Sequence, residues 1–175
     1  MGWLYSERWP IRKYLIKHLV ANEGSKYKAV RHCCVGNHLW VVFEATLEEK
    51  TVRNICLFKM QFHTKDYPYW GYKDIDESMG PNEVTCPLSY IDMCTEPTSE
   101  YSREWRERVR AYHRLRSRKL NIDDEIILYG KTYRVCEDLG RKGYSVKLLP
   151  ATGPGYRLKP SQIYLIEILR KEKQS

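Results

Sequence analysis

Three strand-like runs, at residues 27–35, 38–47 and 51–61, constrain the fold more than any other feature of this chain. The middle run is rich in β-branched and aromatic side chains, which are enriched in strands because they fit a pleated, half-buried surface. Gly36-Asn37 predicts a tight hairpin turn after the first run, and Glu48-Glu49-Lys50 predicts a turn after the second. The pattern therefore predicts a three-stranded antiparallel sheet.

An amphipathic helix is predicted before this sheet, over residues 10–21. Pro10 suits a first helical turn, and apolar side chains then recur at the spacing of one helix face. Such a helix buries its apolar side against another element. We therefore expect it to pack on one face of the sheet and to complete an α+β domain over residues 1–97.

Residues 62–86 break the strand period, and we interpret this stretch as a long structured loop. Its carboxylates could bind a divalent cation, as in a metal-dependent nuclease with Lys59 or Lys73 nearby, but their spacing matches no recognised metal loop. The favoured interpretation is structural, because carboxylates hydrogen-bond to loop amides and aromatic rings fix a loop to the core. The residues concerned are Trp70, Tyr72, Asp74, Asp76 and Glu77.

A basic helix is predicted over residues 98–120, with Thr98 or Ser99 as its cap. On a helical wheel its arginines lie opposite Trp105 and Tyr112, so the arginine side is predicted to face solvent. Guanidinium groups suit bidentate contacts with phosphate or carboxylate, although a solvated helix face is the alternative explanation. The candidate binding residues are Arg103, Arg106, Arg110, Arg114, Arg118 and Lys119, with Arg157 and Lys159 further along the chain.

The last part of the chain, residues 121–175, consists of short strand-like stretches separated by glycine-containing turns. That pattern predicts a small SH3-like β barrel. The complete prediction is an α+β chain with an N-terminal helix on a three-stranded antiparallel sheet, a long basic linking helix over residues 98–120, and a small C-terminal barrel.

Composition narrows the class of function. Lys and Arg number 30 against 22 Asp and Glu, and the net charge of +8 favours a polyanionic partner such as nucleic acid. The six cysteines form no CxxC pair, which argues against a structural zinc site. Charged residues interrupt the first apolar stretch, so no signal peptide is predicted. No apolar run approaches the length of a transmembrane helix, so no membrane span is predicted. Without a catalytic or phosphate-loop motif, we expect a cytoplasmic protein that is not an enzyme and has no cofactor or metal.

Four strings spread over most of the chain carry a family resemblance: Met1-Gly2-Trp3, GYKDIDESMGP at Gly71–Pro81, Cys86-Pro87, and YSREWRERVR at Tyr101–Arg110. Together they resemble a family of small proteins carried by phages and integrative elements of Firmicutes. Within that setting the chain is similar to type II anti-CRISPR proteins, which inhibit Cas9. The resemblance implies a non-enzymatic inhibitor in the bacterial host cell, whose partner is Cas9 or another nuclease-effector complex, with DNA or RNA as further partners.

The sequence therefore leaves two hypotheses for the function. One is an inhibitor that binds Cas9, its nucleic acid, or both, and blocks target-DNA binding or cleavage. The other is a basic nucleic-acid-binding accessory protein of a phage or integrative element, whose affinity weakens steeply with salt.

Overall fold

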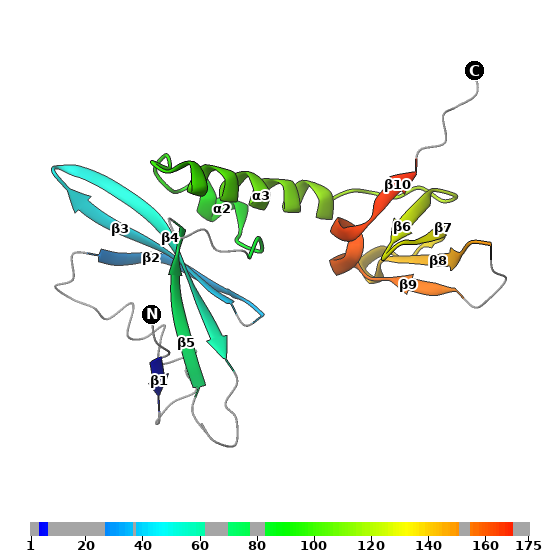
Figure 1. Ribbon diagram of the computed structural model, residues 1–175, viewed down its shortest axis with the longest axis horizontal. Coiled ribbons are helices and arrows are strands. Elements are labelled where there is room, and N and C mark those ends of the chain that lie inside the picture. The colour runs from blue at the N-terminus through cyan, green and yellow to red at the C-terminus, as the bar shows by residue number, and fades with distance from the viewer. Residues whose placement is uncertain are drawn as a thin grey trace. The chain divides into compact units, whose positions relative to one another are not determined.

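A computed structural model describes residues 4–6, 27–36, 38–61, 70–77, 83–150 and 155–169. The chain forms two compact units, Met1–Arg110 and Ala111–Ser175, here called the first and second units (Figure 1). The predicted helix at residues 10–21 lies outside the described residues. None of the described helices is long and apolar enough to cross a membrane.

The first unit contains a five-stranded antiparallel sheet with the strand order β1-β5-β4-β3-β2 (Figure 1). Three of its strands occupy the predicted runs and pair antiparallel as predicted. Two further strands extend the sheet, so the predicted number of three strands is wrong. The strands are β1 (Leu4–Ser6), β2 (Tyr27–Val35), β3 (His38–Leu47), β4 (Lys50–Gln61) and β5 (Trp70–Asp76).

Strand β5 overturns the prediction of one long loop over residues 62–86. Its backbone pairs with β4 on one side, where Asp74 lies opposite Phe58 and Asp76 opposite Cys56, and with β1 on the other. Gly71 and the acidic residues suggested a turn, since such residues are depleted in strands. The pairing partners on both sides override that local preference.

The central strand β3 is buried on both faces. Trp40 and Val42 belong to one apolar cluster, while Leu39 and Val41 belong to a second cluster on the opposite face. A strand that is buried on both faces needs apolar side chains at consecutive positions rather than at alternate ones. This requirement explains the uninterrupted LWVVF run in β3.

Two helices cover the Trp40 face, namely α2 (Leu88–Ile91) and α3 (Glu100–Arg116). The indole rings of Trp40 and Trp105 stack with centroids 5.8 Å apart. Ser99 caps α3, because its Oγ accepts a hydrogen bond from the Ser102 N–H at 3.2 Å. The predicted long basic linking helix is therefore wrong: α3 ends before residue 120, and its apolar side is part of the first unit's core.

The second unit contains another five-stranded antiparallel sheet, with the order β10-β6-β7-β8-β9. Its elements are β6 (Glu125–Leu128), β7 (Lys131–Asp138), the 3-10 helix η2 (Gly140–Lys142), β8 (Tyr144–Leu148), β9 (Tyr156–Leu158), the 3-10 helix η3 (Pro160–Leu165) and β10 (Glu167–Leu169). No pairing joins β9 to β10 among the described strands, so the predicted closed SH3-like barrel is wrong.

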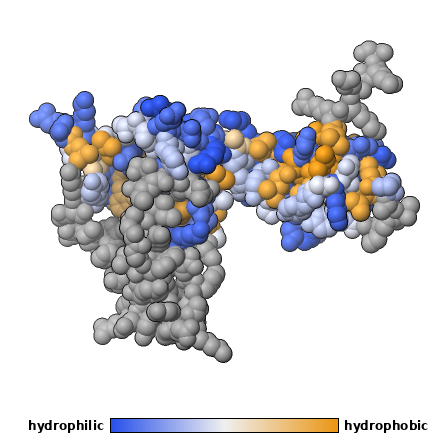
Figure 2. Space-filling view, viewed as in Figure 1, coloured by the Kyte–Doolittle hydropathy of each residue, from blue (hydrophilic) through white to orange (hydrophobic). Residues whose placement is uncertain are grey.

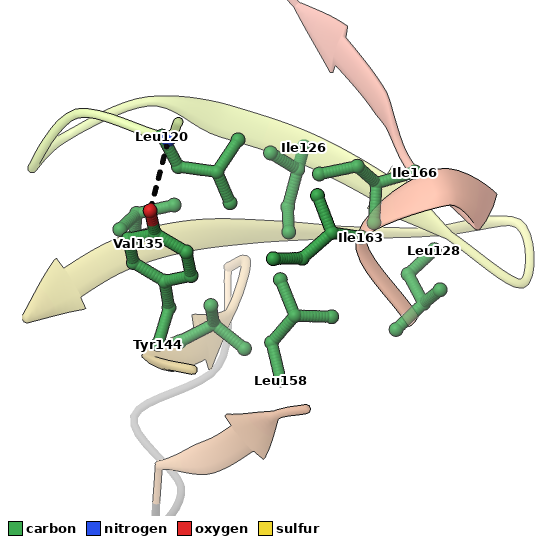
Figure 3. Packing of buried hydrophobic residues seen from close by; sticks show 9 residues of the cluster. Leu120, Ile126, Leu128, Val135, Tyr144, Leu158, Ile163 and Ile166 are labelled. Carbon is green, nitrogen blue, oxygen red and sulfur yellow. Dashed lines mark hydrogen bonds between the residues drawn. The ribbon is translucent and has the colours of Figure 1, made fainter. Parts of the chain in front are cut away.

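A compact apolar core holds this open sheet together. Ile126, Val135 and Leu158 contribute from three strands, and Ile163 from η3 covers them (Figure 3). The Tyr144 hydroxyl reaches the edge of the core and accepts a hydrogen bond from the Leu120 N–H at 3.2 Å (Figure 3). The edge strands β9 and β10 have three residues each, and η3, which lies between them in the chain, packs on the core through Ile163.

Candidate nucleic-acid interface

The buried side of α3 is set by the spacing of its covered residues. Ser102, Trp105, Arg106, Val109 and Tyr112 are all buried, and they recur at the i, i+3, i+4, i+7 spacing of one helix face. Arg106 therefore lies on the covered side of the helix, and its prediction as an outward contact residue is wrong.

Arg106 pairs with Glu77, the residue that directly follows β5. The guanidinium Nε donates to Glu77 Oε1, and Nη2 donates to Oε2 at 3.2 Å. Each side chain of the pair is 5% exposed, and the Ser102 hydroxyl donates to the Glu77 carbonyl oxygen at 3.2 Å. The bidentate pair supplies the partners that let both charges be buried. A helical wheel could not reveal it, because the partner is 29 residues away in sequence.

Two further predicted contact residues already have intramolecular partners. Arg110 pairs with Glu107 one turn earlier, at 2.7 Å and in an exposed position, where an ion pair is weak and easily exchanged. Arg118 is fixed more firmly, because its Nη2 donates to the carbonyl oxygens of Ile163 at 2.9 Å and Ile166 at 2.7 Å. Arg118 therefore ties the segment after α3 to η3 and to the residue that directly follows η3.

The remaining cations near the end of α3 face solvent. Arg114, Arg116 and Lys119 are exposed, and within the part of the chain that the structure describes no carboxylate pairs with them. Arg116 leans on Tyr112, donating to its hydroxyl at 3.2 Å. Strongly hydrophilic residues gather along α3 in Figure 2. We call Arg114 and Arg116 of α3, together with Lys119 three residues beyond the helix, the cationic end of α3.

The earlier turns of α3 have a different surface. Arg103 and Arg108 are exposed there, but Glu100, Glu104 and Glu107 are exposed beside them, so cations and anions alternate. From residue 108 to residue 122 the sequence contains no acidic residue. The sequence predicts one arginine surface along the whole helix, but only the end of α3 has an exposed surface with cations and no acidic residues.

Net charge is divided unequally between the two units. The second unit contains 14 Lys and Arg against 7 Asp and Glu, a net charge of +7, while the first unit contains 16 against 15, a net charge of +1. The predicted residues Arg157 in β9 and Lys159 directly after it are both exposed in the second unit. Nearly all the excess positive charge of the chain therefore belongs to residues 111–175.

The acidic residues of the predicted loop do not form a metal site among the described residues. Trp70, Tyr72, Asp74 and Asp76 lie in β5, where only their backbone is described, and Glu77 is committed to Arg106. The described residues contain no group of three His, Cys, Asp or Glu side chains that could hold a metal ion.

The thiols of Cys86 and Cys94, near the pair of Arg106 and Glu77, are held in their protonated form. Burial raises the pKa of Cys94 to about 12 and raises the pKa of Cys86 further. A thiol that keeps its proton at neutral pH is a poor nucleophile and a poor metal ligand.

A cluster of charged side chains that the sequence does not predict joins β3 and β4 to the segment before α2. Lys59 Nζ lies 2.5 Å from Glu83 Oε1, His38 Nε2 lies 3.9 Å from the same oxygen, and the Trp105 indole N–H donates to the Glu83 carbonyl oxygen at 2.9 Å. Nothing in the local sequence pattern signals it, since the pairing of β3 with β4 places His38 opposite Lys59 and Glu83 reaches both from a segment outside the strands.

No protein-family model matches the chain, and neither a curated protein nor a solved structure is significantly similar to it.

Proposed function

We propose that this is a non-enzymatic binding protein whose second unit contacts the phosphate backbone of nucleic acid. The observation that carries the proposal is the net charge of +7 on the second unit, together with the exposed cationic end of α3. Neutralising phosphates releases condensed counterions, which is the main source of sequence-independent affinity for nucleic acid. Such a protein, acting in the bacterial cytoplasm, would serve a phage or an integrative element as an accessory factor.

Arg118 supports this assignment through its structural role. Because its guanidinium holds the carbonyl oxygens of Ile163 and Ile166, the segment that carries Lys119 is tied to the folded core of the second unit. Cations on a rigid element lose less conformational entropy when they bind phosphates.

The test is a titration of fluorescent DNA and RNA oligonucleotides at several salt concentrations. Replacing Arg114, Arg116 and Lys119 by Gln should weaken binding to every sequence and reduce the salt slope by about 1 for each lost phosphate contact. The matched control replaces Lys28, Arg31 and Lys50, three exposed cations of the first unit, by Gln. Equal losses in the two variants would show that only total charge matters, and no binding at low salt would refute the proposal.

The second candidate is an inhibitor of Cas9 or of another nuclease-effector complex. It is favoured by the resemblance of Gly71–Pro81 and Tyr101–Arg110 to proteins of phages and integrative elements. The nucleic acid bound within such an effector would offer the same phosphate contacts to the cationic end of α3. Cleavage of a target plasmid by Cas9 at excess inhibitor tests this candidate, which unhindered cleavage would refute for that effector.

A further inference from the structure

The turn between β6 and β7 carries an unexplained aromatic residue. Tyr129 and Gly130 form a two-residue hairpin loop, since Leu128 pairs with Lys131 on either side of it. Both loop residues have positive φ, 51° and 72°, as a type I′ turn requires. Gly130 suits this conformation, but a side chain such as that of tyrosine is disfavoured there, and Asn, Asp or Gly is the usual occupant.

Packing does not compensate for the unfavourable conformation. The Tyr129 side chain is 72% exposed and lies outside the core cluster of the second unit. The β3–β4 turn also has positive φ, at Glu48 and Glu49, so an unfavourable turn alone is not evidence of a function. Tyr129 differs because its residue type also exposes a large apolar ring to water, whereas the glutamates are well solvated.

The chemistry around the ring indicates its ligand. Lys131, the next residue but one, is exposed, and the unit that carries both residues has the net charge of +7. An exposed aromatic ring with an exposed cation two residues along the chain suits a nucleobase, because the base can stack on the ring while its phosphate is held by the cation. A base inside a duplex is already stacked on both faces, so the ring suits unpaired bases.

We propose that Tyr129 is a stacking residue for an unpaired nucleobase of single-stranded DNA or RNA. This inference rests on the proposed nucleic-acid binding and adds to it a preference for single strands. The backbone-directed cations of α3 give affinity for any strand, and Tyr129 adds a contact that a duplex does not offer.

The test compares the binding of an oligo-dT single strand and of a DNA duplex at low salt. Tyr129→Asn should weaken binding to the single strand roughly five-fold or more and leave duplex binding unchanged, while Tyr129→Phe should retain the affinity of the original protein. Because Asn suits the turn better than Tyr, the melting temperature of Tyr129→Asn should be equal or higher. Glu48→Asn is the matched control, since it relieves the same backbone conformation in the first unit and should leave binding unchanged.

The outcomes separate this inference from the proposed function. Unchanged single-strand binding by Tyr129→Asn would overturn the stacking role and leave phosphate binding intact. If Tyr129→Asn bound the single strand normally but inhibited Cas9 less than the original protein, Tyr129 would be a protein-contact residue and the stacking role would be overturned. A lower melting temperature in both Tyr129 variants would show that the residue has a structural role and would overturn the stacking role. No binding of either nucleic acid by the original protein would overturn both proposals.

Discussion

At the scale of single residues, the buried pair of Arg106 and Glu77 has the largest expected effect on stability. Removing one partner leaves the other charge without compensation in an apolar surrounding, which costs about 3–5 kcal/mol. Arg106→Met and Glu77→Met should each lower the free energy of unfolding by that amount. The double variant should lose much less, because neither charge remains.

Urea unfolding followed by tryptophan fluorescence measures this effect in the first unit, since all five tryptophans lie within residues 1–110. Arg110→Met is the matched control, because that arginine is paired with Glu107 at the surface and its loss should cost less than about 1 kcal/mol. A double variant as unstable as the worse single variant would contradict the explanation.

A second prediction at this scale concerns acid stability and His38. Burial lowers the pKa of His38, Glu83 raises it and Lys59 lowers it, so the net pKa is below the ordinary 6.5. The unfolded chain then takes up a proton first as pH falls, and His38 makes the protein less stable below about pH 6.5. Burial raises the pKa of Glu83, but Lys59 and His38 outweigh it and the pKa is lowered, so a second loss begins below pH 4.5.

His38→Gln should therefore flatten the dependence of unfolding free energy on pH between 6.5 and 4.5 and leave the loss below pH 4.5 in place. Urea midpoints measured by tryptophan fluorescence across this range test the prediction. An unchanged slope between pH 6.5 and 4.5 would show that another group is responsible.

At the scale of elements, the sequence predicted those segments whose local pattern agrees with their tertiary surroundings. Strands β2, β3 and β4 are recognisable from their apolar residues and from the turn signals between them, and β-branched and aromatic residues are densest in β3. Strand β5 was missed because its stability comes from pairing with β4 and β1, which no local pattern encodes. The burial of Arg106 was missed for a similar reason, since it depends on Glu77 at the end of that same strand.

The β3–β4 turn gives the prediction at this scale. Glu48 and Glu49 have φ of 48° and 66°, a conformation that favours Asn-Gly in a two-residue hairpin. Glu48→Asn combined with Glu49→Gly should raise the free energy of unfolding of the first unit by about 1–2 kcal/mol. The control Glu48→Gln/Glu49→Gln removes the same charges but keeps the unfavourable conformation, so equal stability of the two double variants would contradict the argument.

At the scale of the whole molecule, charge is segregated between the two units. Counting residues gives the total of +8, but only the border near Arg110 shows that the second unit carries +7 of it. Of the predicted contact residues in this unit, Arg114, Lys119, Arg157 and Lys159 are exposed. Arg118 has instead become part of the scaffold, because backbone carbonyl oxygens far along the chain bind it.

This segregation predicts where a bound oligonucleotide will slow amide hydrogen exchange. Peptides from residues 111–150 and 155–169 should exchange more slowly with the oligonucleotide present, because contacts with the cationic end of α3 and with the β6–β7 turn suppress local opening. Peptides from 38–61 should exchange at the same rate with and without it, which makes them an internal reference. Slower exchange confined to residues 38–61 would place the interface in the first unit and contradict the charge argument.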